Sequence, residues 1–544
     1  MKSKPHWPQQ LFLLANGQTL APKNASREHM GSKAFNLLRM AQLGLPVPPA
    51  LVIGTHYTRH PEECMLPVLS VGLPELEKAT GQTLGDPRNP LIVSVRSGAP
   101  VSMPGMMETL LNIGLCDKTL PGLLRQTGNP RMVWDAYRRL VASYGEIVAG
   151  LSASVFEDAL DHATQGRDER ELDFSELRNL TRQYLVLYAE NARHAFPQDA
   201  QEQLTQAIRA VFASWHAPKA QAYRELNGIS ADMGTAVTLQ RMVFGNTGSH
   251  SGAGVGFTRD PSTGEPQLWV DFLVNAQGED VVSGRRNAHG HEALANVAAQ
   301  AWHELEAATK LLELEFTDMQ DFEFTVQDGA LFLLQTRTGK RTPLATARIA
   351  LDLLDEGVID AATAIERTRG LDEQSLGTVQ LAAQADPQSP LSPLAQAMSA
   401  CSGVASGEIA LDGERAAERT ASGVQVILLR KEAETNDIAA LESASGLLTQ
   451  MGARTSHAAV VARQLGKVCL VACAGLHIDL SSRTVSIGDQ TLKEGDVITL
   501  DGNHGHVYLG KIATVRQLDE ALIARWRALL AGAGHEKQKG KSPA

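Results

Sequence analysis

The chain has 544 residues, of which 43% are hydrophobic and 20% charged, so it is expected to form two to four compact units rather than one core. Its 61 acidic and 50 basic residues give a formal charge of -11, and the sequence has no dense basic stretch that would neutralise a nucleic-acid backbone. Nucleic acid is therefore excluded as an expected partner, whereas a local basic pocket for a nucleotide is compatible with this balance.

The five cysteines are few, odd in number and scattered, which argues against a disulfide framework and favours the reducing cytoplasm. Near the start, residues 10–15 supply an apolar run that is too short for a signal peptide or a membrane span. This run is expected to be a strand of a soluble protein that has no membrane contact.

The first part of the chain alternates strand and helix signals. Residues 91–95 predict a strand that leads into a loop of small residues, 96–105, where backbone can approach a ligand. From residue 132 to about 230, apolar residues recur at the helical spacing of three and four. Strand signals return at 236–243, 254–257 and 268–274, so this part is expected to be an α+β nucleotide-binding fold with a helical insertion.

The second part begins with a predicted helix, 346–356, that ends at Gly357, and with a proline-rich stretch, 385–393, that is typical of a linker or hinge. A further compact unit is expected from about 400 to 511, with strands at 424–429, 468–471 and 497–500. A final helix near 518–530 runs into a polar tail that is expected to be disordered.

The strongest chemical signal is Gly452-Ala-Arg-Thr-Ser-His457-Ala-Ala-Val-Val, a loop and helix between two apolar strands. Ser456 is the predicted N-cap, which places His457 in the first turn of the helix, where free N–H groups and the positive end of the dipole collect. Such a position favours a neutral, nucleophilic imidazole and an anion attached to it. Arg454 and Thr455 are expected to donate further hydrogen bonds. An isolated histidine there would more often bond only locally, but the surrounding pattern favours the nucleophile.

Residues 318–337 predict a hairpin on which Asp321 and Glu323 share one face. A three-residue turn with Gly329 left-handed would bring Gln335 and Arg337 to that face, whereas a two-residue turn would put Gln335 on the other. Oxygen ligands beside an arginine suit a Mg²⁺–triphosphate group. A solvated surface hairpin is the alternative interpretation.

Two other patterns are weaker evidence for a functional site. The glycine-rich segment 249–261 is a weak candidate for a phosphate cradle, because it lacks the Walker spacing and no helix follows it. Cys469 and Cys473 lie in an apolar strand region and are interpreted as packing residues rather than zinc ligands.

Taken in order, several motifs resemble those of pyruvate, phosphate dikinases, which are relatives of phosphoenolpyruvate synthase, over the first two thirds of such enzymes. They are Gly31-Ser-Lys33-Ala-Phe-Asn36, Val93-Ser-Val-Arg96-Ser-Gly-Ala, Ser102-Met-Pro-Gly-Met-Met-Glu-Thr109, Phe257-Thr-Arg-Asp-Pro-Ser-Thr-Gly-Glu265, Asn275-Ala-Gln-Gly-Glu-Asp280, Gln335-Thr-Arg-Thr-Gly-Lys340 and Thr455-Ser-His-Ala-Ala-Val-Val-Ala-Arg463.

The resemblance implies an α+β multidomain protein. An ATP-grasp-like nucleotide-binding domain would cover residues 1–340, with its helical insertion at about 120–230, and a helical linker and hinge would follow at 341–395. A swivelling β/α phosphohistidine domain would cover 396–512, and a C-terminal helix with a disordered tail would cover 513–544.

The resemblance also implies the site. His457 would be the phosphohistidine, with Arg337 and Arg454 as further catalytic residues, and Glu323 and Gln335 would hold Mg²⁺ as well as nucleotide. The remaining nucleotide-binding residues would be Lys33, Arg96, Arg139, Glu279 and Asp321.

In the reaction that the family implies, the histidine attacks the β-phosphorus of ATP and AMP leaves. Inorganic phosphate then accepts the γ-phosphoryl group, so pyrophosphate is released, and the phosphohistidine passes its group to pyruvate. Ser456 before the histidine and Ala-Ala-Val-Val after it resemble the phosphate-using dikinase more than the water-using synthase.

The sequence departs from the family pattern at two points. Ser32 replaces the second glycine of the family's first motif, which affects local loop geometry. The sequence ends where the family continues into the barrel that binds pyruvate, so the acceptor is expected on a separate polypeptide. The alternatives are a dikinase for a different small-molecule acceptor and a non-catalytic nucleotide-binding regulatory protein. The presence of His457, Glu323, Gln335 and Arg337 together disfavours the last of these.

Overall fold

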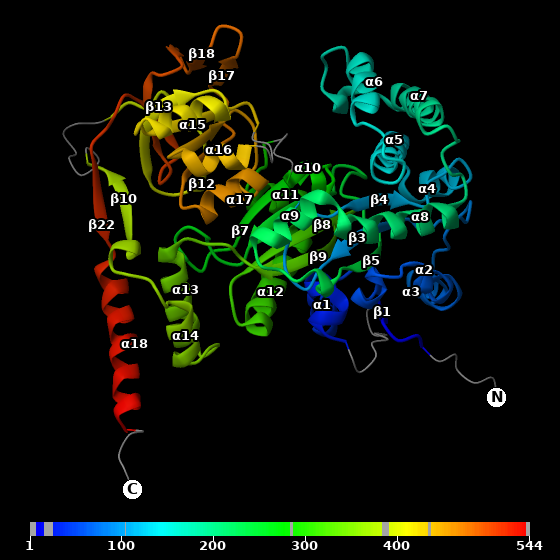
Figure 1. Cartoon of the computed structure of the whole chain (residues 1–544), viewed down its shortest axis with the longest axis horizontal. Helices are drawn as coiled ribbons and strands as arrows, with labels where there is room; N and C mark the ends of the chain where they lie inside the picture. The colour runs from blue at the N-terminus through cyan, green and yellow to red at the C-terminus, as the bar shows by residue number, and fades with distance from the viewer. Residues whose placement is uncertain are drawn as a thin grey trace. The chain divides into compact units, whose positions relative to one another are not determined.

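The computed structural model describes residues 7–15, 25–103, 105–282, 287–382, 391–432 and 437–539. Contacts group the chain into two compact units, one of Met1–His250 with Leu331–Thr336 and one of Ser251–Ala330 with Arg337–Ala544. Both units combine sheets with helices (Figure 1), which confirms the predicted α+β class. The four-part division of the chain at residues 340, 395 and 512 stays a prediction.

The first unit is built on a five-stranded antiparallel sheet of order β1-β2-β5-β3-β4. The strand predicted at 10–15 is confirmed. The prediction that Arg96 lies in the loop of small residues is wrong. Arg96 pairs with Thr109 on one side and Thr238 on the other, so it lies in the strand, and the loop of small residues begins at Ala99. The strands are β1 (Leu11–Leu14), β2 (Ala50–Ile53), β3 (Val93–Gly98), β4 (Thr109–Ile113) and β5 (Ala236–Arg241).

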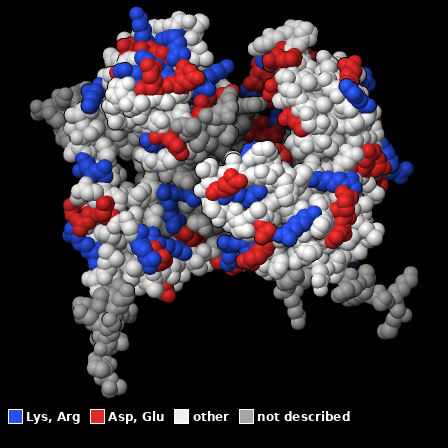
Figure 2. All heavy atoms as spheres, in the orientation of Figure 1, with Lys and Arg blue, Asp and Glu red and all other residues white. Residues whose placement is uncertain are grey.

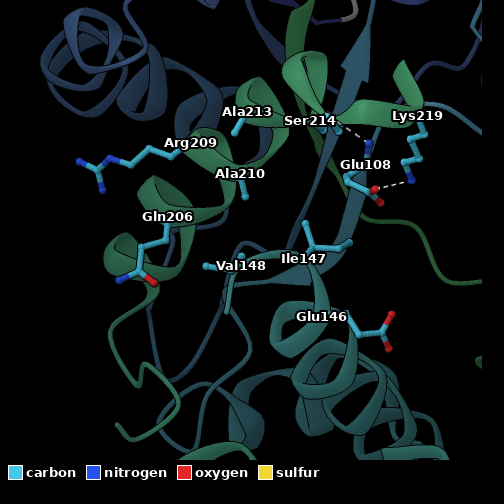
Figure 3. A pocket seen from close by; sticks show the side chains of 11 residues that line it. Glu108, Glu146, Ile147, Val148, Gln206, Arg209, Ala210, Ala213, Ser214 and Lys219 are labelled. Carbon is cyan, nitrogen blue, oxygen red and sulfur yellow. Dashed lines mark hydrogen bonds and ion pairs between the residues drawn. The ribbon is translucent and has the colours of Figure 1, made fainter. Parts of the chain in front are cut away.

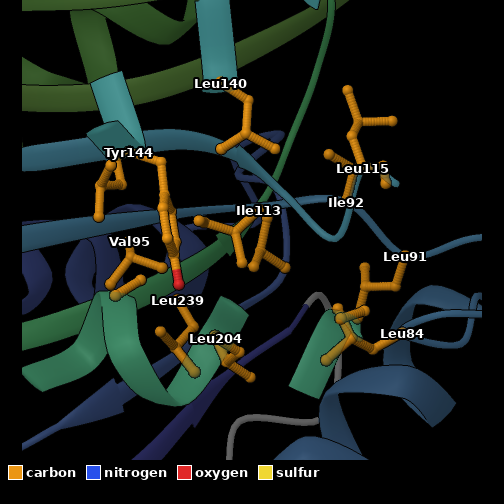
Figure 4. Close-up of a cluster of buried hydrophobic side chains, with 14 of the residues drawn as sticks. Leu84, Leu91, Ile92, Val95, Ile113, Leu115, Leu140, Tyr144, Leu204 and Leu239 are labelled. Carbon is orange, nitrogen blue, oxygen red and sulfur yellow. The ribbon is translucent and has the colours of Figure 1, made fainter. Parts of the chain in front are cut away.

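The chain between β4 and β5 is mainly helical, and it packs its apolar face onto this sheet. In α5 (Pro130–Ile147), Asn129 caps the first turn through a 3.0 Å bond from Met132 N–H, and the buried positions Leu140 and Tyr144 join the core. Figure 4 shows these side chains with Ile113 of the sheet and Leu204 of α8. The other helices here are α4 (Leu120–Thr127), α6 (Ser154–Thr164), α7 (Phe174–Ala192), α8 (Ala200–Ala213) and α9 (Pro218–Leu226).

Helices α1 (Arg27–Gln42), α2 (Glu62–Pro67) and α3 (Leu73–Thr80) complete the main elements of the first unit. Helix α1 begins at the N-cap Ser26 and is interrupted at Gly31, whose φ of 74° lies in the left-handed region. The helix therefore changes direction one turn after its start, two residues before Lys33.

The second unit begins with an antiparallel sheet in which β6 (Gly252–Phe257) pairs with both β7 (Trp269–Val274) and β8 (Gln320–Gln327). Between β7 and β8 the chain forms α10 (Gly278–Val282), α11 (His291–Val297) and α12 (Ala299–Phe316), and β9 (Ala330–Thr338) follows β8. The strand predicted at 268–274 is confirmed by β7.

The glycine-rich segment 249–261 is not a phosphate-binding loop, because its glycines lie in strand β6. A Cβ atom on Gly252, Gly254 or Gly256 would come within 2.1 to 2.6 Å of the rings of Phe272, Phe324 and Phe322, respectively. The glycines therefore leave room for aromatic rings on one face of the sheet, and their spacing of two was the signal of a strand.

The segment after residue 391 forms an eight-stranded sheet of order β11-β21-β20-β13-β14-β15-β16-β12. Strands β13 to β16 run parallel and are joined by helices α15 to α17, as right-handed β-α-β units require. The elements are β11 (Ala395–Gln396), β12 (Met398–Cys401), β13 (Val404–Ala410), α15 (Gly413–Ala421), β14 (Val426–Arg430), α16 (Ile438–Ser443), β15 (Gly446–Thr449), α17 (His457–Gln464), β16 (Val468–Val471), β20 (Val497–Asp501) and β21 (His506–Leu509). A small sheet of β17 (Leu476–Asp479), β18 (Thr484–Ile487) and β19 (Gln490–Lys493) is inserted before β20.

Two connections lead into and out of this domain, and they pair with each other. Strand β10 (Gly377–Leu381) on the way in and β22 (Thr514–Leu518) on the way out form an antiparallel ribbon (Figure 1). Most of the proline-rich linker predicted at 385–393 lies outside the described residues. The ribbon connects to helices α13 (Pro343–Asp355), α14 (Ala361–Arg367) and α18 (Glu520–Lys539). Leu344 of α13 and Trp526 of α18 belong to one buried cluster with Leu376, which lies just before β10.

Helix α18 differs from the sequence prediction, since residues 531–539 continue the helix instead of forming a disordered tail. Alanine, glutamate, lysine and glutamine in this stretch are good helix formers and extend the preceding turns. None of the helices in the described part of the chain is both long and apolar enough to cross a bilayer. Basic and acidic side chains are interspersed on the face seen in Figure 2.

Candidate functional site

In the first unit, Lys33 and Arg96 come from elements that meet through two glycines. A Cβ atom on Gly31 would lie 1.8 Å from the carbonyl oxygen of Gly98, and one on Gly98 would lie 3.8 Å from Cβ of Lys33. Ser32 N–H donates to the carbonyl of Ala99 at 3.0 Å, and its hydroxyl bonds the carbonyl of Pro100. The start of α1 is thus held against the end of β3 and its loop, and the serine that departs from the family motif ties the two together.

Gln335 belongs to the same unit and is buried, with 5% of its surface exposed. Its neighbour Thr336 accepts a 2.8 Å bond from the amide of Asn36, one helical turn after Lys33. The first unit therefore gathers three elements that carry predicted nucleotide-binding residues: the start of α1, the end of β3 and strand β9.

Arg139 lies apart from this cluster, on helix α5 of the insertion. It pairs with Asp135 at 2.9 Å and with Glu169 at 3.1 Å, and Arg138 binds the same two carboxylates at 2.6 and 3.0 Å. Burial tends to raise the pKa of Asp135, but the neighbouring arginines lower it overall. The role of Arg139 in nucleotide binding stays a prediction.

A pocket of about 840 Å³ in the first unit is lined by residues from α5, α8 and α9 and by Glu108 (Figure 3). Glu108 is paired with Lys219 at 2.6 Å, and its backbone N–H bonds the hydroxyl of Ser214 at 3.2 Å. None of the predicted site residues lines this pocket, so it belongs to a different part of the unit from Lys33 and Arg96.

In the second unit, the strand register places several polar side chains in two rows on one face of the sheet. Phe257 of β6 pairs with Trp269 of β7 and with Asp321 of β8. Two residues along, Val255 pairs with Asp271 and with Glu323. Because directly paired residues point to the same side, Asp321 and Glu323 share a face with Trp269 and Asp271.

Arg337 joins Asp321 on this face, as the sequence predicted for one form of the hairpin. Its Nε donates to Oδ2 of Asp321 at 2.9 Å, and a second contact measures 2.8 Å. Asp321 is 3% exposed; burial raises the pKa of its carboxyl, and the charge of Arg337 opposes this rise. Burial tends to lower the pKa of Arg337, but the carboxylates of Asp321 and Glu323 raise it overall.

The hairpin turn itself has two residues, Asp328 and Gly329, with φ of 51° and 83°. This is the form with two left-handed residues that hairpins favour, and it corrects the three-residue turn on which the predicted face was built. The pair of Arg337 with Asp321 forms nevertheless. The place of Gln335 beside Glu323 as a metal ligand stays a prediction.

Hydrogen bonds from the first turn of helix α17 and from Arg463 connect the loop before His457 to its surroundings. Helix α17 begins at His457, and its N-cap Ser456 accepts a bond from Ala459 N–H at 3.4 Å, as predicted. Arg463, on the same helix and 1% exposed, donates to the carbonyls of Ala400 at 2.7 Å and Arg454 at 3.3 Å. The backbone of His457 is thus at a helix N-terminus, while its side chain lies outside the described part of the structure.

This loop lies on the polar face of the β7–β6–β8 sheet. Arg454 Nε donates to Oδ1 of Asp271 at 2.8 Å, and both the N–H and the hydroxyl of Thr455 donate to Oδ2, at 3.1 and 3.2 Å. The guanidinium of Arg454 stands 3.9 Å from the ring centre of Trp269, and Ala453 is buried in a cluster with Val255 and Leu273.

Helix α17 extends over the neighbouring row. The guanidinium of Arg463 lies 5.2 Å from the ring centre of Phe257 and 5.4 Å from that of Trp269. Burial raises the pKa of Asp321, and the charge of Arg463, like that of Arg337, opposes this rise. The helix that His457 begins therefore covers the row that ends in Asp321.

Two residues of this face, Trp269 and Asp271, were not predicted from the sequence. The alternation Trp-Val-Asp-Phe-Leu in β7 was a usable signal, because it puts an aromatic ring and a carboxylate on the same face of a strand. Glu279, which was predicted, lies exposed on the short helix α10.

Comparison with known proteins identifies two matched segments of the chain. The family model "Pyruvate phosphate dikinase, AMP/ATP-binding domain" matches residues 62–293, and "PEP-utilising enzyme, mobile domain" matches residues 423–505. The first range includes Arg96, Arg139 and Glu279, and the second includes Arg454 and His457.

Similar whole proteins include pyruvate, phosphate dikinase 1, chloroplastic, of Zea mays, which is 40% identical over 495 residues, covering 89% of this chain and 52% of the relative. The pyruvate, phosphate dikinase of Rhizobium meliloti (strain 1021) is 41% identical over 508 residues, covering 89% and 56%, respectively. The chain thus spans a little over half the length of these relatives. In order along the chain, the two matched segments are thus the AMP/ATP-binding domain of pyruvate, phosphate dikinases and the mobile domain of PEP-utilising enzymes.

Proposed function

We propose that the protein is an ATP-dependent phosphotransferase of the dikinase type, in which His457 receives a phosphoryl group from ATP. The observation that supports this most directly is the position of the His457 loop on the sheet face that carries Asp321, Glu323 and Arg337. A helix N-terminus placed there suits both a neutral imidazole nucleophile and the phosphoryl group that it would gain.

In the proposed reaction, a nitrogen of His457 attacks the β-phosphorus of ATP, the bond from that phosphorus to the bridging oxygen of AMP breaks, and AMP leaves. An oxygen of inorganic phosphate then attacks the γ-phosphorus, and the bond from that phosphorus to the oxygen bridging it to the β-phosphorus breaks. Pyrophosphate is released, and the β-phosphoryl group stays on His457. Arg337, held by Asp321, would offset charge on the transferred group, with Arg454 close to the histidine in sequence. The phosphate-binding cations in the first unit would be Lys33, Arg96 and Arg139.

Glu323 offers a half-buried carboxylate and Gln335 an amide oxygen, both hard ligands of the kind that suit Mg²⁺. These two residues would hold the ion, which would supply positive charge to offset that of the triphosphate. Glu279 and Asp321 are proposed to contact nucleotide.

The acceptor is proposed to be pyruvate, which the names of the relatives include, or another small molecule, with a separate polypeptide as its binding site. The reducing cytoplasm is the proposed location, which five buried, free cysteines support.

The test is incubation of the purified chain with Mg²⁺ and ATP labelled at the β-phosphate, followed by acid and alkali treatment. We expect one label per chain that is stable in alkali and labile in acid, formed together with AMP, and absent from His457→Ala. Equal labelling of His457→Ala would refute the proposal. AMP formation that increases with added phosphate would identify phosphate as the acceptor of the γ-phosphoryl group.

A further inference from the structure

Asp271 is a carboxylate with 0% exposure whose hydrogen bonds, among the described residues, all come from the His457 loop. A buried carboxylate costs several kcal/mol unless charged or polar groups compensate it. Here the compensation is supplied by the guanidinium of Arg454 and by two donors of Thr455. Strand β7 therefore carries a charge that is stabilised only while this loop is in place.

Trp269, two residues earlier on the same face, forms a binding site for the side chain of Arg454 together with Asp271. The guanidinium stacks on its ring at 3.9 Å, while Nη2 of Arg454 donates to the carbonyl of Val270 at 3.0 Å. Stacking on an aromatic face and a bond to a backbone carbonyl together fix the plane of a guanidinium, which a lysine would not reproduce.

We propose that Asp271 and Trp269 are positioning residues that hold the His457 loop for phosphoryl transfer from the nucleotide, and that they act through Arg454 and Thr455 rather than on the nucleotide. This inference rests on the proposed function. The oxygens of Asp271 are engaged by the loop, whereas Glu323, on the other side of Val255, is the residue proposed to face the nucleotide.

The proposal predicts that substitutions at the docking face slow the labelling of His457 from ATP but not from phosphoramidate. ATP reaches His457 only when the loop is docked, whereas phosphoramidate, a small donor that loses ammonia as its phosphoryl group passes to an imidazole, needs no docking. In Asp271→Asn, labelling from ATP should slow by about 10- to 100-fold, the range expected for a reacting group displaced by about 1 Å. Labelling from phosphoramidate and the affinity for ATP should stay at the values of the unaltered chain.

Two further variants test the contact of Arg454 with Asp271 and Trp269. Arg454→Met should slow ATP labelling to a similar extent, and the double variant with Asp271→Asn should be no slower than the slower single variant, because both changes remove one interaction. Trp269→Leu removes the ring without leaving a buried charge, and so tests docking even where Asp271→Asn folds poorly. Asp328→Asn, at the hairpin turn of the same sheet, is the matched control and should label at the normal rate.

The outcomes are distinguishable. Unchanged ATP labelling in both Asp271→Asn and Trp269→Leu would overturn the inference. So would equal slowing with ATP and phosphoramidate, or an ATP affinity reduced in proportion to the rate, which would make Asp271 a nucleotide ligand. If the unaltered chain takes label from phosphoramidate but none from ATP, the proposed function itself fails.

Discussion

Asp271 and Glu323 occupy the same row of the β7–β6–β8 sheet, because Val255 of β6 is the register partner of both. Two strand steps separate them, a distance of about 10 Å. The residue that anchors the His457 loop and the residue proposed to bind Mg²⁺ are therefore fixed on one rigid face. The His457 loop, docked at Asp271, therefore lies two strand spacings from Glu323.

Replacement of Arg337 should test its proposed action on the transferred phosphoryl group. We expect Arg337→Met to slow His457 labelling from ATP by about 100-fold or more, because a preorganised charge at the reacting group is lost. Arg337→Lys should be intermediate, since it keeps the charge without the planar fork. Single-turnover labelling rates measure both. Arg415→Met, which removes an exposed pair with Glu418, is the control, and equal rates in Arg337→Met and the control would contradict the role.

The pH dependence of stability should show the burial of Asp321. Burial raises the pKa of its carboxyl above the ordinary value of 3.8, so the folded state binds this proton more tightly than the unfolded chain. The resulting stabilisation is complete below the ordinary pKa and is lost as pH rises through the higher folded pKa. The free energy of unfolding relative to Asp321→Asn should therefore fall over this window in denaturant titrations, and a constant difference would show that the folded pKa is not raised.

Gly31→Ala should destabilise the first unit by more than the cost of its left-handed backbone angle alone. The left-handed φ of 74° costs a non-glycine residue about 1–3 kcal/mol, and the new Cβ would also meet the carbonyl of Gly98 at 1.8 Å. Gly44→Ala, with φ of 77° and open space around it, carries only the first cost. We expect Gly31→Ala to be the less stable variant in thermal unfolding and to bind ATP more weakly. Equal behaviour of the two would show that the close approach has no consequence.

Labelling of His457 should require a divalent cation. Removal of Mg²⁺ with EDTA is expected to abolish it and added Mg²⁺ to restore it, because the triphosphate is proposed to bind as its magnesium complex. Glu323→Gln should raise the Mg²⁺ concentration at half-maximal labelling, since an amide is a weaker ligand than a carboxylate. Glu304→Gln, on the exposed face of α12, should not change it. An unchanged requirement in Glu323→Gln would remove this residue from the proposed metal site.

Local patterns in the sequence were sufficient for the elements around the site. The N-cap at Ser456 and the helical stretch after residue 132 follow from spacing and residue type alone, whereas the pair of Asp321 with Arg337 was predicted only for a three-residue turn. The hairpin turn was predicted wrongly, because Asp-Gly occurs in both turn forms and the two differ only in φ. The docking face could not be predicted, since Asp271 and Arg454 are 183 residues apart and only the folded chain brings them together.

The paired strands β10 and β22 constrain how the mobile domain of this chain can evolve. Since its incoming and outgoing segments are bonded residue by residue, from Gly377 with Leu518 to Leu381 with Thr514, neither can be lengthened without the other. Insertions are therefore expected in both strands together or in neither. A reorientation of the domain would twist β10 and β22 together about a common axis.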